Sequence, residues 1–235
     1  MVQLSLEEKR DILKNHFLLC HLRDWDLERL ARHSRIAEIP AGETIFRKYD
    51  AGDTMIVVIS GRVVICSHSV DGREVVFNII NAGEVFGEIA FLDGRERTAD
   101  ARVLEDVTCL VLDRRHFLPF LEENPKVVIE LMTVLCERVR STTVHIEDTA
   151  FLEFRTRLAK KLLAFAEHYG TAVAQGSRIE LSLSQTDLGA MLNATRESVN
   201  RQLRSWVKKG LIEIDKGSIT LLEPERIEDI ADAIE

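Results

Sequence analysis

The spacing of hydrophobic positions changes along the 235 residues, and each change predicts a different kind of element. In about the first 35 residues, Leu13, Phe17, Leu27 and Leu30 recur at helical intervals. Asp24 is the candidate N-cap within this stretch. The N-terminal part of the chain is therefore predicted to be helical.

After Pro40 the pattern becomes typical of β-structure. Short runs rich in β-branched residues are separated by glycines, Gly61 among them, as in an antiparallel sheet folded through tight turns. Asp71-Gly72 is the strongest hairpin signal. The pattern predicts a compact β-barrel or β-roll. The candidate strands are Met55–Ile59, Val63–Cys66, Val75–Ile80 and Thr108–Leu112.

From Pro125 to about Leu152 the chain has no further glycine or proline, and the apolar period is helical again. One apolar stripe follows this segment at close to heptad spacing. The stripe fits a helix packed on its own β-roll, and it fits equally well a seam between helices of a bundle or dimer. Its members are Val128, Leu131, Leu135, Val139, Thr142 and Ile146.

The remaining residues predict a small helical domain with a hairpin. Two helices joined by a short turn, the second one basic, form a helix-turn-helix. Ser184 and Asp187 form a capping box for the first of them, Thr195 can cap the second, and Asn193 suits the turn between them. The predicted elements are a helix at Phe154–Tyr169, a polar loop at Gly170–Ser177, helices at Ser184–Met191 and Thr195–Lys209, and a hairpin of Leu211–Asp215 with Ser218–Leu222.

Charge is distributed unevenly in this acidic chain, whose formal net charge is -8. Residues 154–235 carry 12 basic and 12 acidic side chains, so the first 153 residues account for the whole excess. Within the neutral part, Thr195–Lys209 has a local charge of +4. A basic helix in an acidic protein is a candidate for nucleic-acid contact.

Composition excludes several classes of protein. Apolar residues make up 46% and charged residues 30%, as in ordinary globular proteins, and no apolar run approaches the ~20 residues that span a bilayer. Residues 1–10 lack the apolar core of a signal peptide, so we expect a cytoplasmic protein with no membrane contact. The four cysteines lack the paired spacing of zinc or iron–sulfur sites and are expected to be buried thiols. They are Cys20, Cys66, Cys109 and Cys136.

The segment Phe86–Ala99 carries a candidate binding site. A phosphate needs exposed backbone N–H groups and a fixed cation. Gly87 permits close approach of the backbone, and Arg97 supplies a forked donor. Glu88 suits a ribose hydroxyl and not a phosphate. A cation for phosphate beside an anion for ribose describes a nucleotide site.

The order F-G-E-I-A followed by R-T-A, with Arg97 nine residues after Glu88, is similar to the phosphate-binding cassette of cyclic-nucleotide-binding domains. Together with the long helix and the basic helix-turn-helix, it makes nearly the whole chain resemble the CRP/FNR family of bacterial transcription regulators, its cyclic AMP receptor branch most of all. The resemblance implies an α+β protein with three parts. These are a jelly-roll-like cyclic-nucleotide-binding β-roll with N-terminal helices at 1–124, a dimerisation helix at 125–152, and a winged helix-turn-helix at 153–235.

By position, the resemblance implies that Gly87 and Glu88 hold the ribose 2′-hydroxyl of cyclic AMP and that Arg97 and Thr98 hold its phosphate. On the long helix, Arg138 and Thr142 would face the adenine, with Thr143 supplied by the partner subunit. The spacing from Glu88 to Arg97 is one residue shorter than in the best-known enterobacterial member. The full implied set is Gly87, Glu88, Ile89, Ala90, Arg97, Thr98, Ala99, Arg138, Thr142 and Thr143.

Residues 195–201 form the second candidate site. Arg196, Glu197 and Arg201 lie near one another on a helix, where arginine can read guanine and glutamate can accept from cytosine. The same R-E-x-x-x-R pattern in the family reads G·C pairs of a TGTGA-type half-site in double-stranded DNA. The candidate DNA contacts are Ser184, Gln185, Thr195, Arg196, Glu197, Asn200 and Arg201, whereas Lys208 and Lys209 fit phosphate contacts and solvated positions equally well, and Val199, Leu203 and Trp206 are expected in the core.

Several alternatives stay open. The effector can be cyclic GMP, because Thr98 can bond a guanine amino group, or another ligand, or none. An enzyme is disfavoured because no catalytic set has recognisable spacing, and no metal site is expected. The missing N-terminal cysteine cluster disfavours an iron–sulfur sensor, and the intact cassette disfavours a haem sensor. The expected partners are operator DNA and a second copy of the chain, with RNA polymerase as a further candidate.

Overall fold

The computed structural model describes residues 4–16, 19–20, 22–181, 183–215 and 217–233. Contacts divide the chain into two compact units, Met1–Val139 and Arg140–Glu235. Helix α5 (Pro125–Phe151) contributes residues to both units, which are described separately below. The boundaries predicted at residues 124 and 152 stay a prediction.

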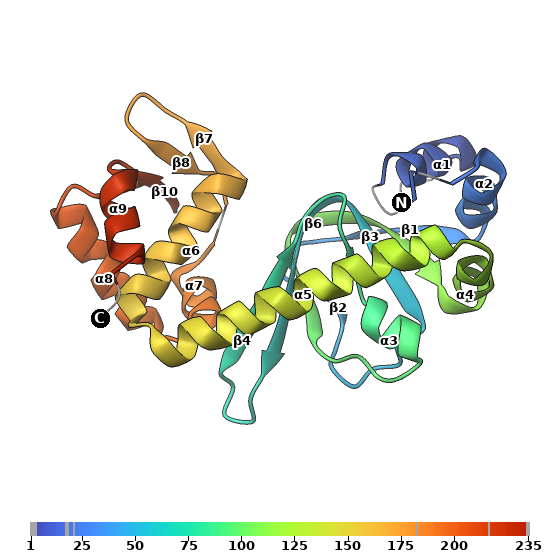
Figure 1. Cartoon of the computed structure of the whole chain (residues 1–235), viewed down its shortest axis with the longest axis horizontal. Coiled ribbons are helices and arrows are strands. Elements are labelled where there is room, and N and C mark those ends of the chain that lie inside the picture. The colour runs from blue at the N-terminus through green and yellow to red at the C-terminus, as the bar shows by residue number, and fades with distance from the viewer. Residues whose placement is uncertain (1–3, 17–18, 21, 182, 216, 234–235) are drawn as a thin grey trace. The chain divides into compact units, whose positions relative to one another are not determined.

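The first unit is a six-stranded antiparallel sheet with helices packed against it (Figure 1). Its strands follow the order β1-β6-β3-β4, with β2 paired to β6 and β5 paired to β3. The elements are α1 (Leu6–Asn15), α2 (Asp24–Arg32), β1 (Ser34–Ile39), β2 (Thr44–Phe46), β3 (Thr54–His68), β4 (Glu74–Ile80), β5 (Val85–Phe86), α3 (Glu88–Asp93), β6 (Asp100–Asp113), α4 (Arg114–Glu123) and the first part of α5.

Two apolar clusters form the core of this unit. One joins helices α1, α2, α4 and the start of α5 to the sheet, and it includes Leu13, Leu27, Phe117 and Leu131. The other fills the interior of the roll. Each fully buried side chain of this kind contributes roughly 1.5–3 kcal/mol of hydrophobic stabilisation. The second cluster consists of Ile56, Val58, Val63, Ile80, Phe86, Ala101, Val103, Val107, Cys109 and Val111.

Strand β3 is one long strand where the sequence predicts two. Gly61 lies inside it at φ +82°, and a Cβ atom there would be 2.1 Å from the carbonyl oxygen of Asp106. The register with β6 shifts on both sides of this position, which marks a bulge. The turn predicted at Gly61 is therefore wrong, because the chain bends there without reversing. The hairpin at Asp71-Gly72 is confirmed, since β3 and β4 pair antiparallel across it.

The helical N-terminus is confirmed with two corrections. It consists of two helices, α1 and α2, and β1 already begins at Ser34. Asp24 is the first residue of α2 and not its cap; the N-cap position is Arg23, whose side chain makes no capping bond. The predicted helical position Phe17 lies outside the described residues.

Helix α5 follows its predicted bounds, but the predicted apolar stripe divides between two faces. Leu131 is buried and Val128 packs against the same core as α4, so this part of the stripe covers the helix's own unit. The exposed apolar residues repeat on a neighbouring line with alternating spacings of three and four, which is a heptad pattern. That line consists of Ile129, Met132, Cys136, Val139 and Ile146, with the polar Thr143 at the one remaining position.

The second unit is a winged helix-turn-helix. It contains the end of α5, α6 (Phe154–Tyr169), β7 (Gly170–Ala172), β8 (Ser177–Ile179), α7 (Gln185–Met191), α8 (Arg196–Lys208), β9 (Ile212–Asp215), β10 (Ser218–Leu221) and α9 (Pro224–Ala231). Its four strands follow the order β7-β8-β10-β9. The core contains Leu158, Leu162, Leu188, Val199, Leu203, Trp206, Leu211 and Ile227.

Most predictions for this unit are confirmed, including α6 and the β9–β10 hairpin. The polar loop predicted at Gly170–Ser177 is wrong, because residues at both of its ends pair as β7 and β8. Helix α9 was not predicted, and neither were α3 and α4 in the first unit. Two of the four cysteines, Cys20 and Cys136, are exposed and not buried as expected.

Candidate functional site

The first candidate site opens at the turn between β5 and α3. Gly87 caps α3 at φ +78°, in the left-handed region that glycine adopts without the penalty of a Cβ atom. A Cβ at this position would lie 2.6 Å from Nη1 of Arg97 and 3.2 Å from the carbonyl oxygen of Thr54. The absence of a side chain at residue 87 therefore lets the arginine lie directly against the turn.

Arg97 is buried, with 4% of its surface exposed, and its guanidinium is held on three sides. Nη1 donates to the carbonyl oxygen of Gly87 and Nη2 donates to Oγ1 of Thr54, both at 2.8 Å. The guanidinium carbon lies 4.1 Å from the ring centre of Phe46, a cation–π contact. Burial lowers the pKa of Arg97, and the nearby carboxylates of Asp53 and Glu88 oppose that shift. The guanidinium stays protonated, so the site holds a fixed cation.

Glu88, the first residue of α3, is 1% exposed and forms an ion pair with Arg138 of α5. Arg138 also donates to the carbonyl oxygen of Val85. Among the residues that the structure describes, Oε2 of Glu88 is buried without a hydrogen-bond partner. A buried acceptor of this kind costs free energy until a donor reaches it. Glu88 is therefore suited to accept a hydrogen bond from a hydroxyl group of a bound molecule.

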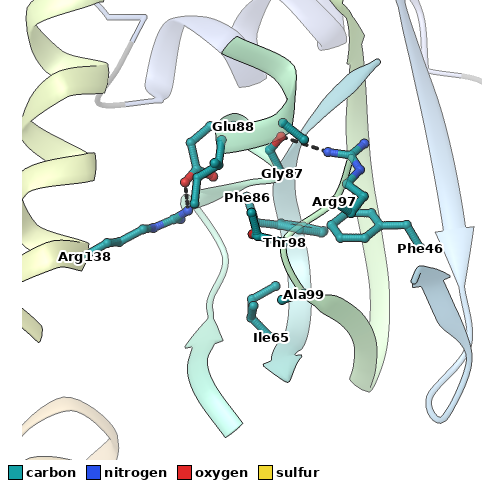
Figure 2. A pocket seen from close by; sticks show the side chains of 11 residues that line it. Phe46, Ile65, Phe86, Gly87, Glu88, Arg97, Thr98, Ala99 and Arg138 are labelled. Carbon is teal, nitrogen blue, oxygen red and sulfur yellow. Dashed lines mark hydrogen bonds and ion pairs between the residues drawn. The ribbon is translucent and has the colours of Figure 1, made fainter. Parts of the chain in front are cut away.

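These residues line one pocket with about 340 Å³ of space, part of it open to solvent (Figure 2). The pocket brings together eight of the ten predicted ligand contacts: Gly87, Glu88, Ile89, Ala90, Arg97, Thr98, Ala99 and Arg138. Three apolar walls, Phe46, Ile65 and Phe86, were not predicted. Phe86 was within reach of sequence reasoning because it precedes Gly87 in the motif, whereas Phe46 and Ile65 come from distant strands.

Thr142 and Thr143 are exposed residues of α5 that belong to the second unit. The residues that line the pocket, described above, come from the first unit. Their assignment to the ligand, including the contribution of Thr143 from a partner subunit, stays a prediction.

The second candidate site is the helix pair α7–α8. The hydroxyl of Ser184 accepts from the backbone N–H of Asp187 at 3.1 Å, and the backbone N–H of Ser184 donates to the Asp187 carboxylate at 3.0 Å, which completes the predicted capping box. Thr195 caps α8 by accepting from the backbone N–H of Ser198 at 3.2 Å. Asn193 lies between the helices at φ +48°, as predicted. The caps fix where each helix begins.

Helix α8 is divided into a buried face and an exposed basic face. Val199, Leu203 and Trp206 are buried, which confirms their predicted place in the core. Five of the predicted DNA contacts are exposed: Arg196, Glu197, Arg201 and the two N-cap residues Ser184 and Thr195. Gln185 and Asn200 are half-buried. A shallow hollow along the exposed face is lined by Glu197, Asn200, Arg201, Arg204, Ser205 and Lys208. Arg204 and Ser205 were not among the predicted contacts.

Arg157 of α6 ties the helices of the second unit together. Its Nη1 donates to the carbonyl oxygen of Leu152 at 2.6 Å, just after the end of α5. Its Nη2 donates to the carbonyl oxygen of Leu192 at 3.1 Å, at the C-cap of α7. One side chain therefore joins the end of α5 to the turn that precedes α8.

Comparison with known proteins identifies a domain family for each of the two regions that carry a candidate site. Residues 36–124 match the cyclic nucleotide-binding domain model, and residues 156–230 match the Crp-like helix-turn-helix domain model. The chain is 30% identical over 192 residues to the cyclic AMP receptor protein of Thermus thermophilus, covering 82% of this chain and 86% of that one. It is 29% identical over 198 residues to the CRP-like cAMP-activated global transcriptional regulator of Mycobacterium tuberculosis, covering 84% and 88%.

Among solved structures, the chain is similar in fold to the c-di-GMP-responsive global regulator of Xanthomonas campestris. The TM-score is 0.76 at 22% identity, covering 86% of this chain and all of that one. Within the described residues, no helix is long and apolar enough to cross a membrane.

Proposed function

The chain belongs to the CRP/FNR family of transcription regulators, and on that premise we propose that cyclic AMP is its effector and that its dimer binds a palindromic operator of TGTGA-type half-sites. Regulators of this family bind DNA through the helix-turn-helix domain and act as dimers; they are not enzymes. The chain is accordingly a cyclic-nucleotide-binding transcription regulator.

One observation carries the proposal for the ligand: a fixed cation and a buried, partly unpaired carboxylate line the same small pocket. Arg97 offers guanidinium N–H groups to a phosphate. Oε2 of Glu88 needs a donor, which a ribose hydroxyl supplies. Apolar walls beside the two charges suit the flat faces of a base and a sugar. A simple anion would use Arg97 and be repelled by Glu88, so a nucleotide fits better than a free phosphate.

The identity of the base is the finer part of the proposal. The most similar relatives reported above are named for cyclic AMP, which favours adenine. Thr98 lines the pocket and is exposed, so its hydroxyl can reach a ligand. A guanine amino group is one partner it could accept, and cyclic GMP is therefore the second candidate.

Calorimetric titration of the whole protein with cyclic AMP, cyclic GMP and c-di-GMP tests the ligand. We expect cyclic AMP to bind most tightly. Arg97→Gln and Glu88→Gln should each weaken binding by about 2–4 kcal/mol, because each removes a charge-assisted contact in a desolvated site. Arg95→Gln is the matched control, an exposed arginine two residues away. If both pocket variants stay within twofold of the unmodified protein, the site is wrongly assigned.

For the DNA site, the support is the exposed basic face of α8 beside a properly capped α7. The proposed contacts are Ser184, Gln185, Thr195, Arg196, Glu197, Asn200 and Arg201. Arginine and glutamate at the start of α8 are exposed where a recognition helix reads base edges in the major groove. Arg196→Ala should abolish preference for a TGTGA palindrome over a scrambled duplex. Lys209→Ala should weaken binding to the palindrome and to the scrambled duplex equally. Equal preference before and after Arg196→Ala would contradict the assignment.

The proposed control of DNA binding runs through α5. Arg138 reaches the pocket from α5, and the same helix continues to Thr142 and Thr143 in the second unit. Bound nucleotide would favour one packing of the α5 pair in the dimer, and it can shift that equilibrium only by its differential affinity. Operator affinity measured with and without saturating cyclic AMP, at one salt concentration, tests this. Thr142→Ala with Thr143→Ala should leave nucleotide bound but reduce its effect on operator affinity. Unchanged operator affinity in the unmodified protein would overturn the proposal.

A further inference from the structure

Three metal-ligating side chains meet on one face of the sheet in the first unit, away from the nucleotide pocket. Cys66 and His68 are two residues apart on β3 and therefore point to the same face of the sheet. Asp100 of β6 is the direct cross-strand partner of Cys66. Glu74 of β4 is the direct partner of His68. Strands β4, β3 and β6 are neighbours in the sheet (Figure 1). Their register places a thiol, an imidazole and two carboxylates together.

The ligand atoms of Cys66, His68 and Asp100 all lie within 4.8 Å of one another. Nδ1 of His68 is 2.8 Å from Oδ2 of Asp100, and Nε2 of His68 is 3.7 Å from Oε1 of Glu74. Oδ1 of Asp100 accepts from the backbone N–H of Lys48 at 2.7 Å, which fixes the carboxylate and leaves Oδ2 directed at the cluster. A ligand held by a backbone donor is the arrangement that orients metal-binding carboxylates.

The donor set selects a class of metal. Sulfur, imidazole nitrogen and one carboxylate oxygen are ligands of zinc-like transition metals, whereas calcium and magnesium prefer oxygen alone. Metal–ligand distances of about 2.0–2.3 Å require donor atoms slightly closer together than 4.8 Å. His68 is about half exposed, at 49% of its side chain, so its ring can make this adjustment by rotation.

We propose that Cys66, His68 and Asp100 bind one divalent transition-metal ion of the zinc class. Binding breaks the S–H bond of Cys66, forms a metal–sulfur bond and releases the proton to solvent. Glu74 adds negative potential beside the site and is itself held by Arg102 at 3.3 Å. Burial together with the neighbouring Glu74 carboxylate raises the pKa of the Cys66 thiol to about 12. A cation at this position would offset that negative surrounding.

The site lies on the opposite face of β3 from the pocket. Ile65 lines the pocket and directly precedes Cys66 within β3, where successive residues point to opposite faces. Ala99 also lines the pocket and directly precedes Asp100, the first residue of β6. The proposal does not depend on the identity of the nucleotide, because no pocket residue is a proposed ligand.

The competing interpretation is a hydrogen-bonded network without metal. In that case the ring nitrogens of His68 face the carboxylates of Asp100 and Glu74, and Cys66 is a buried thiol. This network would bind no ion, so titration with metal separates the two interpretations.

The test is titration of the metal-stripped full-length protein with Zn²⁺ against a chromophoric chelator. It uses a Cys20→Ser, Cys136→Ser background because both of these thiols are exposed. We expect one ion per chain, and a thiolate charge-transfer band when Co²⁺ replaces Zn²⁺. Cys66→Ser, His68→Gln and Asp100→Asn should each lower affinity at least tenfold. The controls Cys109→Ser and His168→Gln should not change it.

His68→Gln decides the outcome if the buried Cys66→Ser variant fails to fold, because His68 lies at the surface. Substoichiometric Zn²⁺ at micromolar concentration, an unchanged affinity in His68→Gln, or Co²⁺ binding without a thiolate band would each overturn the proposal. Nucleotide affinity of the unmodified protein is measured in parallel. Absence of nucleotide binding together with one bound zinc ion per chain would count against the proposed function and not against the metal site.

Discussion

Nη1 of Arg97 donates a 2.8 Å hydrogen bond to the carbonyl oxygen of Gly87 and occupies the space that a side chain at residue 87 would take. The guanidinium of Arg97 and the turn that carries Glu88 are therefore packed together. A change on either side displaces the other. This dependence makes the glycine itself testable.

Gly87→Ala should weaken nucleotide binding at least tenfold. The added Cβ would lie 2.6 Å from Nη1 of Arg97, so the guanidinium must leave its position. Gly83→Ala is the matched control, because Gly83 has a similar φ of +85° but no atom of the described residues lies within 4 Å of its Cβ position. Both variants should lose about 1–2 kcal/mol of stability from the left-handed backbone. Calorimetry should detect the loss of affinity in Gly87→Ala alone, and an equal loss in both would refute the explanation.

The ion pair between Glu88 and Arg138 should show strong coupling in a double-mutant cycle. Arg138→Leu leaves a carboxylate that is 1% exposed without its cation, which costs about 3–5 kcal/mol. Adding Glu88→Gln removes the buried charge and should recover more than 1 kcal/mol of that loss. Urea unfolding of the four proteins, followed by hydrogen exchange of β3 amides, measures the coupling. Simple additivity would mean that the pair contributes no specific interaction.

The exposed heptad line of α5 predicts where two copies of the chain meet. Met132→Glu with Val139→Glu should produce a folded monomer, because these side chains are 58% and 66% exposed within one chain and contribute little to its own core. Leu131→Glu should instead unfold the first unit, since Leu131 is buried in that core. Sedimentation and circular dichroism distinguish these results. A Met132, Val139 double variant that still sediments as a dimer would exclude this face of α5.

Trp206 is the largest fully buried side chain among the described residues of the second unit, and within that part of the chain its indole Nε1 has no hydrogen-bond partner. Trp206→Ala should cost about 3–5 kcal/mol by creating a cavity under α8. Trp206→Phe keeps an aromatic ring and removes an unsatisfied donor, so it should cost less than half as much. Urea unfolding followed by far-ultraviolet circular dichroism gives both values. Equal losses would indicate that the indole N–H is paired.

Acid should destabilise the first unit through His16. Burial lowers the pKa of His16 to about 4, against 6.5 for a free histidine, although a hydrogen bond to the backbone of Gly83 partly opposes the shift. Between these values the unfolded chain binds a proton that the folded chain does not. The contribution of neutral, buried His16 to the free energy of unfolding is therefore complete above pH 6.5. It decreases by about 3 kcal/mol as the pH falls towards 4. His16→Gln should flatten this pH dependence, and His168→Gln, at an exposed position, should not.

The sequence was most informative where local rules decide the structure. The capping box of Ser184, the cap of Thr195 and the left-handed turn at Asn193 depend on residues within a few positions, and all three are present. The cluster of Gly87, Glu88 and Arg97 was also predictable, because its chemistry lies within eleven residues. Short-range pattern was enough for these features.

The features that the sequence did not predict have a common physical cause, which is pairing between segments far apart in the chain. Gly61 resembles a turn glycine, and only its close approach to Asp106 makes it a bulge. The cluster of Cys66, His68 and Asp100 depends on the β3–β6 register, which no local spacing reveals. The walls Phe46 and Ile65 reach the pocket in the same way. Strand partners are a property of the whole fold.

The two bonds of Arg157 also set how the second unit can respond to force. Its guanidinium donates to the carbonyl oxygens of Leu152 and Leu192, so it links the end of α5 directly to the turn before α8. A rotation of the end of α5 would then be transmitted to α8 through these two hydrogen bonds. Lysine lacks the planar fork that reaches both carbonyl oxygens. Arg157→Lys should therefore leave each helix intact while increasing the relative motion of α5 and α8.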